Sequence, residues 1–327
     1  MPDPRRSHEI PPAAQPGEIV AGKYRVDRLL GRGGMGVVVA ATHLALDQKV
    51  ALKFVHEGAI GWERSGDGAL VDAEQLEERA RSKKKSEEAL ERFLREARAA
   101  AKMKSEHVAR VFDVDVLESG EPYIVMELLE GHDLARLKAE RGGKLTPEEA
   151  AEYVLQACEA LVEAHALGVV HRDLKPQNLF LTRKVGGAPL VKVLDFGISK
   201  VLRGPDDAEL TDNLTQTSML MGSPHYMSPE QLKNAKQVDA RSDVWSMGAV
   251  LFKLLTGVNA FEAATTPELC VQILMGEPRR LTLCRADAPQ ALEDVIARCL
   301  AKDPAARFGS VSELAQALQP FAHAASH

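Results

Sequence analysis

Four polar residues lie close together in the chain with the types and spacing that phosphoryl transfer requires. The stretch 171–178 reads His-Arg-Asp-Leu-Lys-Pro-Gln-Asn, and Asp-Phe-Gly follows at 195–197. Asp173 can orient and deprotonate an attacking hydroxyl, while Lys175 can neutralise charge on the moving phosphate. Asn178 and Asp195 can hold Mg²⁺ between the phosphates. Either motif alone is more often an ordinary turn or strand end, but together, in this order, they are a specific signal.

A glycine cluster upstream could bind the phosphates of a nucleotide. Residues 31–38 fit the pattern G-x-G-x-x-G-x-V, which dinucleotide-binding folds also contain. In those folds the glycines open a helix, whereas here a β-branched run suited to a strand follows them. Glycines between two strands let backbone N–H groups close over phosphates without Cβ obstruction. The next strand-like run, 50–55, contains Lys53.

Taken together, these motifs resemble the protein kinase family from about Tyr24 to about Phe321. The stretches Gly-Gly-Met-Gly at 33–36 and Tyr-Met-Ser-Pro-Glu-Gln at 226–231 look like those of bacterial eukaryotic-like serine/threonine kinases. The resemblance implies an α+β bilobal fold, with a β-rich N-lobe of five strands plus helix C and a large α-helical C-lobe. It also implies ATP and Mg²⁺ as cofactors, with Mn²⁺ as an alternative metal.

The order of expected elements agrees with that architecture. Strand-like runs lie between Tyr24 and Val55, and helical spacing of apolar residues predicts a helix over Glu87–Lys104. The N-cap Thr146 followed by Pro147 predicts a helix that runs to about Leu167. The remaining expected elements are strands at 108–115, 123–128 and 191–194 and a run of helices over 230–321.

These elements predict the domain organisation. We expect a disordered leader at 1–20, a kinase domain at 21–322 and a tail at 323–327. The kinase domain divides into an N-lobe at 21–128, with an insertion at 57–86, and a C-lobe at 129–322. The insertion is charged and rich in helix formers, which favours a solvated extension over a docking surface for a partner.

The resemblance also assigns residues to the nucleotide site. Lys53 anchors ATP and pairs with Glu96 of helix C, for which Glu91 is the nearest competitor. Met126 is the gatekeeper at the hinge, and Asp133 either reaches the ribose or serves as a helix N-cap. The residues expected to contact the cofactor are Leu30, Gly31, Arg32, Gly33, Gly34, Met35, Gly36, Val37, Val38, Ala51, Lys53, Met126, Glu127 and Phe180.

On the substrate side, the resemblance implies structural and regulatory roles. Glu230 would pair with Arg307, and Asp243 would hold the catalytic loop. Between Asp195 and Glu230 the chain is rich in hydroxyls, and Thr215 and Thr217 are the candidate phosphosites, which Arg172 would read. A phosphothreonine brings roughly −1.5 to −2 charges, so its pairing with an arginine could order the loop.

Composition limits the compartment and the partners. The 327 residues carry a net charge of −6 with 27% charged residues, which argues against nucleic acid as the main partner. We expect no membrane span and no signal peptide, and therefore a cytoplasmic protein whose four cysteines are buried free thiols. The chain could also be part of a longer membrane-anchored kinase. Protein substrates with Ser or Thr are the expected partners, and a homodimer would allow trans-autophosphorylation.

Three functions remain open on these residues. The first is an active serine/threonine protein kinase. The second is a pseudokinase scaffold, which the complete set Lys53, Glu96, Asp173, Asn178 and Asp195 argues against. The third is a small-molecule kinase of the aminoglycoside phosphotransferase kind. Such kinases lack the Ser-Pro-Glu segment at 228–230 and its downstream arginine, both of which this chain contains.

Overall fold

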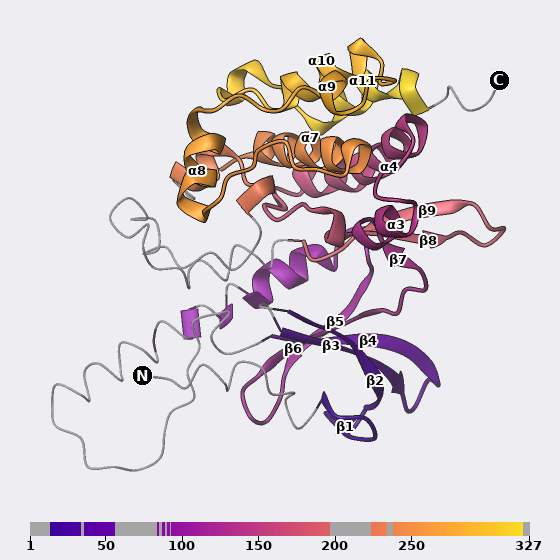
Figure 1. Cartoon of the computed structure of the whole chain (residues 1–327). Helices are drawn as coiled ribbons and strands as arrows, with labels where there is room; N and C mark the ends of the chain where they lie inside the picture. Colours follow the sequence, from indigo (N-terminus) through magenta and orange to yellow (C-terminus); the bar gives the residue numbers. More distant parts are fainter. Residues whose placement is uncertain are drawn as a thin grey trace, which may run out of the picture. The chain divides into compact units, whose positions relative to one another are not determined.

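The computed structural model divides the chain into two compact units (Figure 1). The first unit contains the described residues up to Lys102 together with Arg110–Leu129. The second contains Met103–Ala109 and the described residues from Glu130 onward. The structure describes residues 14–33, 36–55, 84, 87–88, 90–91, 93–196, 224–233 and 238–322.

The first unit is built on one antiparallel sheet with the strand order β1-β2-β3-β4-β6-β5. Its second main element is a helix, whose described part includes residues 93–100. The strands are β1 (Ile19–Val20), β2 (Tyr24–Gly33), β3 (Gly36–His43), β4 (Gln48–Val55), β5 (Val111–Val116) and β6 (Pro122–Glu127).

Alternation along the strands gives this sheet two different faces. Val39, Leu52 and Val125 are in register on one face, where they join a buried apolar cluster that also contains Val20. Because side chains alternate along a strand, Lys53 and its neighbours lie on the opposite face. The cluster therefore fixes which residues the sheet presents on its other side.

The sheet has six strands where the sequence analysis expected five. The additional strand is β1, which lies inside the segment predicted to be a disordered leader. It pairs with β2. Ala14 and Val20 are buried in the apolar cluster, so residues 14–20 belong to the packed unit and that part of the prediction was wrong. The prolines that precede this segment favoured a disordered leader, although the β-branched residues Ile19 and Val20 lie between two glycines.

Two predicted boundaries also shift where the chain passes between the units. The helix predicted to reach Lys104 ends at residue 100, because the backbone N–H groups of Lys104 and Ser105 donate to the Glu163 carboxylate at 2.8 and 2.7 Å. The strand predicted from Val108 begins at Val111. Val108 instead bridges Val193 in the second unit.

The second unit is mostly helical, as expected, but contains a small sheet that the sequence analysis only partly predicted. This sheet has the order β7-β8-β9, and only β9 was expected. Its strands and the helices around them are β7 (His132–Asp133), α3 (Leu134–Glu140), α4 (Pro147–Ala166), η3 (Pro176–Asn178), β8 (Leu179–Arg183), β9 (Pro189–Val193), η5 (Pro224–Tyr226), α6 (Pro229–Lys233), α7 (Ala240–Thr256), α8 (Thr266–Met275), α9 (Leu281–Cys284), α10 (Gln290–Cys299), η7 (Pro304–Ala306) and α11 (Val311–Ala322).

The helix α4 begins as its sequence predicted. Thr146 accepts from Glu149 N–H at 3.2 Å, and the Glu149 carboxylate accepts from Thr146 N–H at 3.4 Å, which completes a capping box. The helix α7 packs against α4 and α10, and α11 packs against α4 (Figure 1). The buried face of α4 is rich in alanine, so neighbouring backbones can approach it closely.

Cysteine burial differs in one place from the expectation. Cys158, Cys270 and Cys299 are buried free thiols, while Cys284 on α9 is exposed. Among the described helices, none is both long enough and apolar enough to cross a membrane. The insertion at 57–86, apart from Lys84, and the tail at 323–327 lie outside the described residues.

The start of β3 depends on a glycine. Gly36 has a φ of +144°, and a Cβ there would overlap the carbonyl oxygen of Phe54. We therefore predict that Gly36→Ala costs about 1 to 3 kcal/mol in backbone strain alone, with steric displacement of β4 added. The variant should melt at a lower temperature than the parent, measured by calorimetry.

Gly33 provides the matched control in the same hairpin, because it pairs with Gly36 across the β2–β3 connection. A Cβ at Gly33 would meet no atom within 4 Å, so Gly33→Ala should melt close to the parent. Equal melting temperatures for the two variants would contradict the assigned close approach.

Candidate active site

The predicted catalytic residues of the 171–178 stretch contact one another. Lys175 Nζ lies 2.8 Å from Asp173 Oδ2. Asn178 Nδ2 donates to the Asp173 backbone oxygen at 2.6 Å and to Asp173 Oδ2 at 3.2 Å. The Asp173 side chain keeps 17% of its surface exposed, so its carboxylate is oriented by two donors and still reachable.

A buried carboxylate on α7 holds the backbone that leads into Asp173. Asp243 is completely buried, and its two oxygens accept the N–H groups of His171 and Arg172, each at 2.9 Å. His165 Nε2 lies 2.8 Å from the same carboxylate. Arg172 has a φ of +67°, a conformation that costs free energy in a non-glycine residue and persists only where neighbours enforce it.

His171 connects this loop to the Asp-Phe segment. Its ring is buried, with Nε2 2.7 Å from the Leu194 carbonyl oxygen. A carbonyl can only accept, so Nε2 carries the proton and Nδ1 accepts the Asp173 N–H at 3.3 Å. The ring also packs against Phe196, with centroids 5.0 Å apart. One neutral imidazole therefore positions Asp173 and the residues on both sides of Asp195.

The predicted metal ligands Asn178 and Asp195 belong to two segments of the second unit that are joined by a backbone hydrogen bond. Leu194 N–H donates to the Asn178 carbonyl at 2.9 Å, and Asp195 follows directly with a φ of +61°. Because the Asn178 amide nitrogen contacts Asp173, its amide oxygen is the atom suited to a cation.

This donor set fits a hard cation such as Mg²⁺ or Mn²⁺. An amide oxygen and a carboxylate are hard ligands, and Mg²⁺ takes few protein ligands alongside phosphate oxygens and waters. The described residues contain no group of three or more His, Cys, Asp or Glu side chains that could hold a metal ion.

Four of the predicted nucleotide residues of the first unit share one face of its sheet, whereas Val37 was wrongly predicted there, because it is buried in the apolar cluster on the opposite face. Lys53 is in register with Val38 and Ile124, and Ala51 is in register with Met126. Lys53 is buried, with 4% of its surface exposed. At these positions the face combines apolar side chains with the buried cation Lys53, as an adenine and its phosphates would require.

Other predicted residues of the first unit have mixed outcomes. Glu96 is half-buried on the helix that includes residues 93–100, between the buried Phe93 and Ala97. Leu30 is 39% exposed beside an irregularity in the pairing of β2 with β3. The Glu127 carboxylate accepts from Arg110 N–H at 2.7 Å, which gives this side chain a structural contact.

In the second unit, Asp133 serves as a helix cap. Its carboxylate accepts from Arg136 N–H at 2.9 Å at the start of α3. Phe180 lies opposite it in the β7–β8 pair and is half-buried. Of the other predicted residues, Gly34, Met35, Gly197, Thr215 and Thr217 lie outside the described part of the chain.

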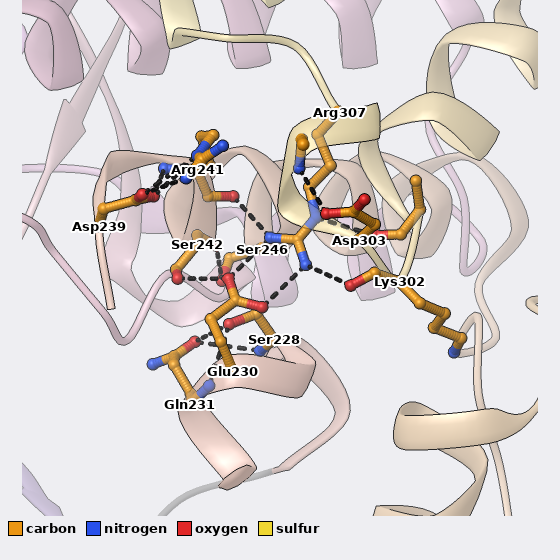
Figure 2. Close-up of polar contacts among 12 residues, drawn as sticks. Ser228, Glu230, Gln231, Asp239, Arg241, Ser242, Ser246, Lys302, Asp303 and Arg307 are labelled. Atoms are coloured by element: carbon orange, nitrogen blue, oxygen red, sulfur yellow. Dashed lines mark hydrogen bonds and ion pairs between the residues drawn. The ribbon is translucent and has the colours of Figure 1, made fainter. Parts of the chain in front are cut away.

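The predicted pair of Glu230 with Arg307 is confirmed (Figure 2). Arg307 donates to both carboxylate oxygens, at 2.7 and 2.8 Å, and its side chain is fully buried. Ser242 Oγ donates to the same carboxylate at 2.6 Å. Burial alone would raise the pKa of Glu230, yet the hydrogen bonds from Arg307 and Ser242 hold it below its ordinary value of 4.5.

Arg307 also contacts the first of two stacked aromatic rings. Trp245 and Phe261 are stacked, with centroids 5.6 Å apart. Arg307 lies over Trp245, and Lys302 lies 4.1 Å above Phe261. Burial lowers the pKa of Lys302 to about 8, because desolvation disfavours its charged form.

Sequence reasoning missed two residues that the site uses. His165 was not singled out, although a histidine near the end of a helix six residues before His171 is visible in the sequence. Gln231, the last residue of the Tyr-Met-Ser-Pro-Glu-Gln stretch, is buried and donates to the Arg172 carbonyl at 2.8 Å. Both contacts join residues more than fifty positions apart, so spacing could not reveal them.

The fold and these contacts are those of a protein kinase domain. Residues 24–320 match the family model of the protein kinase domain, and the chain belongs to this family. The PknI kinase domain of Mycobacterium tuberculosis, solved by crystallography, has a TM-score of 0.67 at 27% identity, and covers 94% of this chain and 98% of its own.

The curated relatives are bacterial serine/threonine kinases. Serine/threonine-protein kinase pkn3 of Myxococcus xanthus is 35% identical over 305 residues, which is 93% of this chain and 50% of the relative. Pkn1 of the same organism is 36% identical over 91% of this chain and 38% of its own length. This chain therefore spans half or less of these relatives.

The buried Glu230–Arg307 pair predicts a dependence of stability on pH. The depressed pKa means that Glu230 contributes fully above pH 4.5 and that this contribution is lost as pH falls through the pKa of the folded state. Glu230→Gln should lower the free energy of unfolding of the second unit by about 3 to 5 kcal/mol at pH 7, since it leaves Arg307 buried without its counter-charge. The difference from wild type should shrink below pH 4.5 in urea titrations.

The surface pair of Arg136 with Glu140, 2.9 Å apart, is the control. Both side chains are largely exposed, so Glu140→Gln should change stability little at any pH. A Glu230→Gln variant as stable as this control at pH 7 would show that the buried pair does not stabilise the unit.

Proposed function

We propose that this chain is an ATP- and Mg²⁺-dependent serine/threonine protein kinase domain. The observation that carries the proposal is the oriented Asp173 carboxylate, which Lys175 and Asn178 contact. His171 accepts the Asp173 N–H, and Asp243 accepts the N–H of Arg172 immediately before it. A reachable carboxylate with an adjacent ammonium group suits an acceptor hydroxyl beside a phosphoryl group.

Each residue has one role in this proposal. Asp173 orients the hydroxyl of a Ser or Thr side chain and takes its proton, while Lys175 stabilises the charge on the transferred group. Asn178 and Asp195 would hold Mg²⁺, which when bound neutralises charge on the phosphates. In the first unit, Lys53 would bind phosphate oxygens, Glu96 would orient Lys53, and Val38, Ala51 and Met126 would line the adenine.

The choice among the three functions rests on the residues present. A scaffold without catalysis would not need an oriented carboxylate contacted by both a lysine and an asparagine. A small-molecule kinase would not need the Ser-Pro-Glu segment anchored on Arg307. The names of the bacterial relatives favour Ser and Thr of proteins as acceptors.

The setting of this activity is likewise a proposal. We place the domain in the cytoplasm with protein substrates, and we propose that it phosphorylates itself at Thr215 or Thr217, for which a transient homodimer would suffice. A phosphosite map of purified protein incubated with Mg-ATP tests this point, and a map without either threonine would overturn it.

The catalytic assignment predicts different defects for the two aspartates. Asp173→Asn should keep ATP affinity near that of wild type but lower the rate of phosphoryl transfer by about a thousandfold or more, because positioning and proton transfer are lost. Asp195→Asn should instead weaken Mg²⁺-dependent ATP binding. Calorimetric titration with ATP and transfer of labelled phosphate to a Ser/Thr peptide measure the two effects separately.

Asp239, an exposed helix cap on α7, serves as the control, and Asp239→Asn should leave both measurements unchanged. Near wild-type transfer by Asp173→Asn would refute the assignment of the catalytic loop.

A further inference from the structure

Gln231 is a buried side chain with two different sets of contacts. Its Oε1 accepts from Ser228 N–H at 3.0 Å and from Ser228 Oγ at 3.2 Å. Its Nε2 donates to the Arg172 carbonyl at 2.8 Å. The opposite amide orientation would place Nε2 against the Ser228 N–H and Oε1 against a carbonyl, so these contacts fix the orientation of the amide.

The contacts of Oε1 belong to the start of α6. Gln231 N–H lies 3.4 Å from Ser228 Oγ, so Ser228 and Gln231 form a capping box three residues apart (Figure 2). Glutamate serves this motif as well as glutamine does. The cap therefore does not require the amide nitrogen, which leaves the contact of Nε2 with Arg172 as a separate feature.

That contact closes a ring of interactions around the strained residue Arg172. The Arg172 N–H donates to Asp243 on α7, and the neighbouring Ser242 donates to Glu230. Glu230 is adjacent to Gln231, whose Nε2 returns to the Arg172 carbonyl. Both polar groups of the Arg172 backbone are thus held by buried side chains, one from α7 and one from α6.

We propose that Gln231 is a positioning residue that links the Ser228–Lys233 segment to the catalytic loop and keeps Arg172 in its left-handed conformation. Arg172 directly precedes Asp173, so its backbone conformation decides where the Asp173 carboxylate lies. Glu230 anchors α6 to Arg307, and Gln231 transmits that fixed position to the loop. This inference rests on the proposed kinase function of Asp173.

The test replaces only the donor. Gln231→Glu keeps the capping box, but it places a carboxylate oxygen, which cannot donate a hydrogen bond, against the Arg172 carbonyl oxygen. Transfer to a Ser/Thr peptide should have a kcat about tenfold to a hundredfold below wild type at pH 8, with the KM for ATP changed little. As pH falls, the introduced carboxyl group becomes protonated and can donate to that carbonyl, so the ratio of variant to wild-type kcat should rise.

A second buried glutamine provides the matched control. Gln156 on α4 accepts from Val191 N–H at 2.7 Å and donates to Glu152 at 2.8 Å, away from the catalytic loop. Gln156→Glu introduces the same chemical change and should give a kcat ratio that does not vary with pH. The proposal would be overturned if the ratio of Gln231→Glu kcat to wild-type kcat did not change with pH, whatever its value. An equal loss of kcat in Gln156→Glu would overturn it as well.

A readout without catalysis separates this inference from the proposed function. At pH 8, backbone amides of residues 171–174 should exchange hydrogen faster in Gln231→Glu than in wild type, and at the wild-type rate in Gln156→Glu. Wild-type protein that transfers no phosphate would refute the kinase proposal alone. Unchanged exchange in Gln231→Glu would refute the positioning role, whatever the activity.

Discussion

The site depends on one buried negative charge, the carboxylate of Asp243. It has no exposed surface, and such a group is stable only if donors replace the water that it loses. His165 and the N–H groups of His171 and Arg172 lie within 2.9 Å of it. Because Asp243 lies in the first turn of α7, its carboxylate also interacts favourably with the helix dipole. In return, the carboxylate fixes the backbone immediately before Asp173.

Ser242, which precedes Asp243 on α7, fixes the Ser228–Lys233 segment. Ser242 contacts Glu230, and Asp243 contacts the catalytic loop, so the two parts of the site take their positions from neighbouring residues on one buried helix. Because α7 is buried along most of its length, its position is set by core packing. A helix in the core thus gives a loop the order that loop residues alone could not supply.

The sequence predicted those parts of the molecule that depend on local pattern. Strand-like runs indicated the segments that carry Val38, Ala51 and Lys53, and capping chemistry placed the start of α4 at Thr146. Family resemblance supplied the Glu230–Arg307 and Asp243 contacts. The sequence did not predict β1, because two residues form a strand only when β2 offers an edge, nor the contact of Gln231 with Arg172, which joins positions 59 residues apart.

The central claim is that Asp243 acts on catalysis through the position of Asp173, and a double-mutant cycle tests it most directly. Single-turnover phosphoryl transfer would be measured for wild type, Asp243→Asn, Asp173→Asn and the double variant. If Asp243 acts through Asp173, Asp243→Asn lowers the rate strongly in the wild-type background and changes it little in the Asp173→Asn background. Equal fold-losses in the two backgrounds would contradict the account.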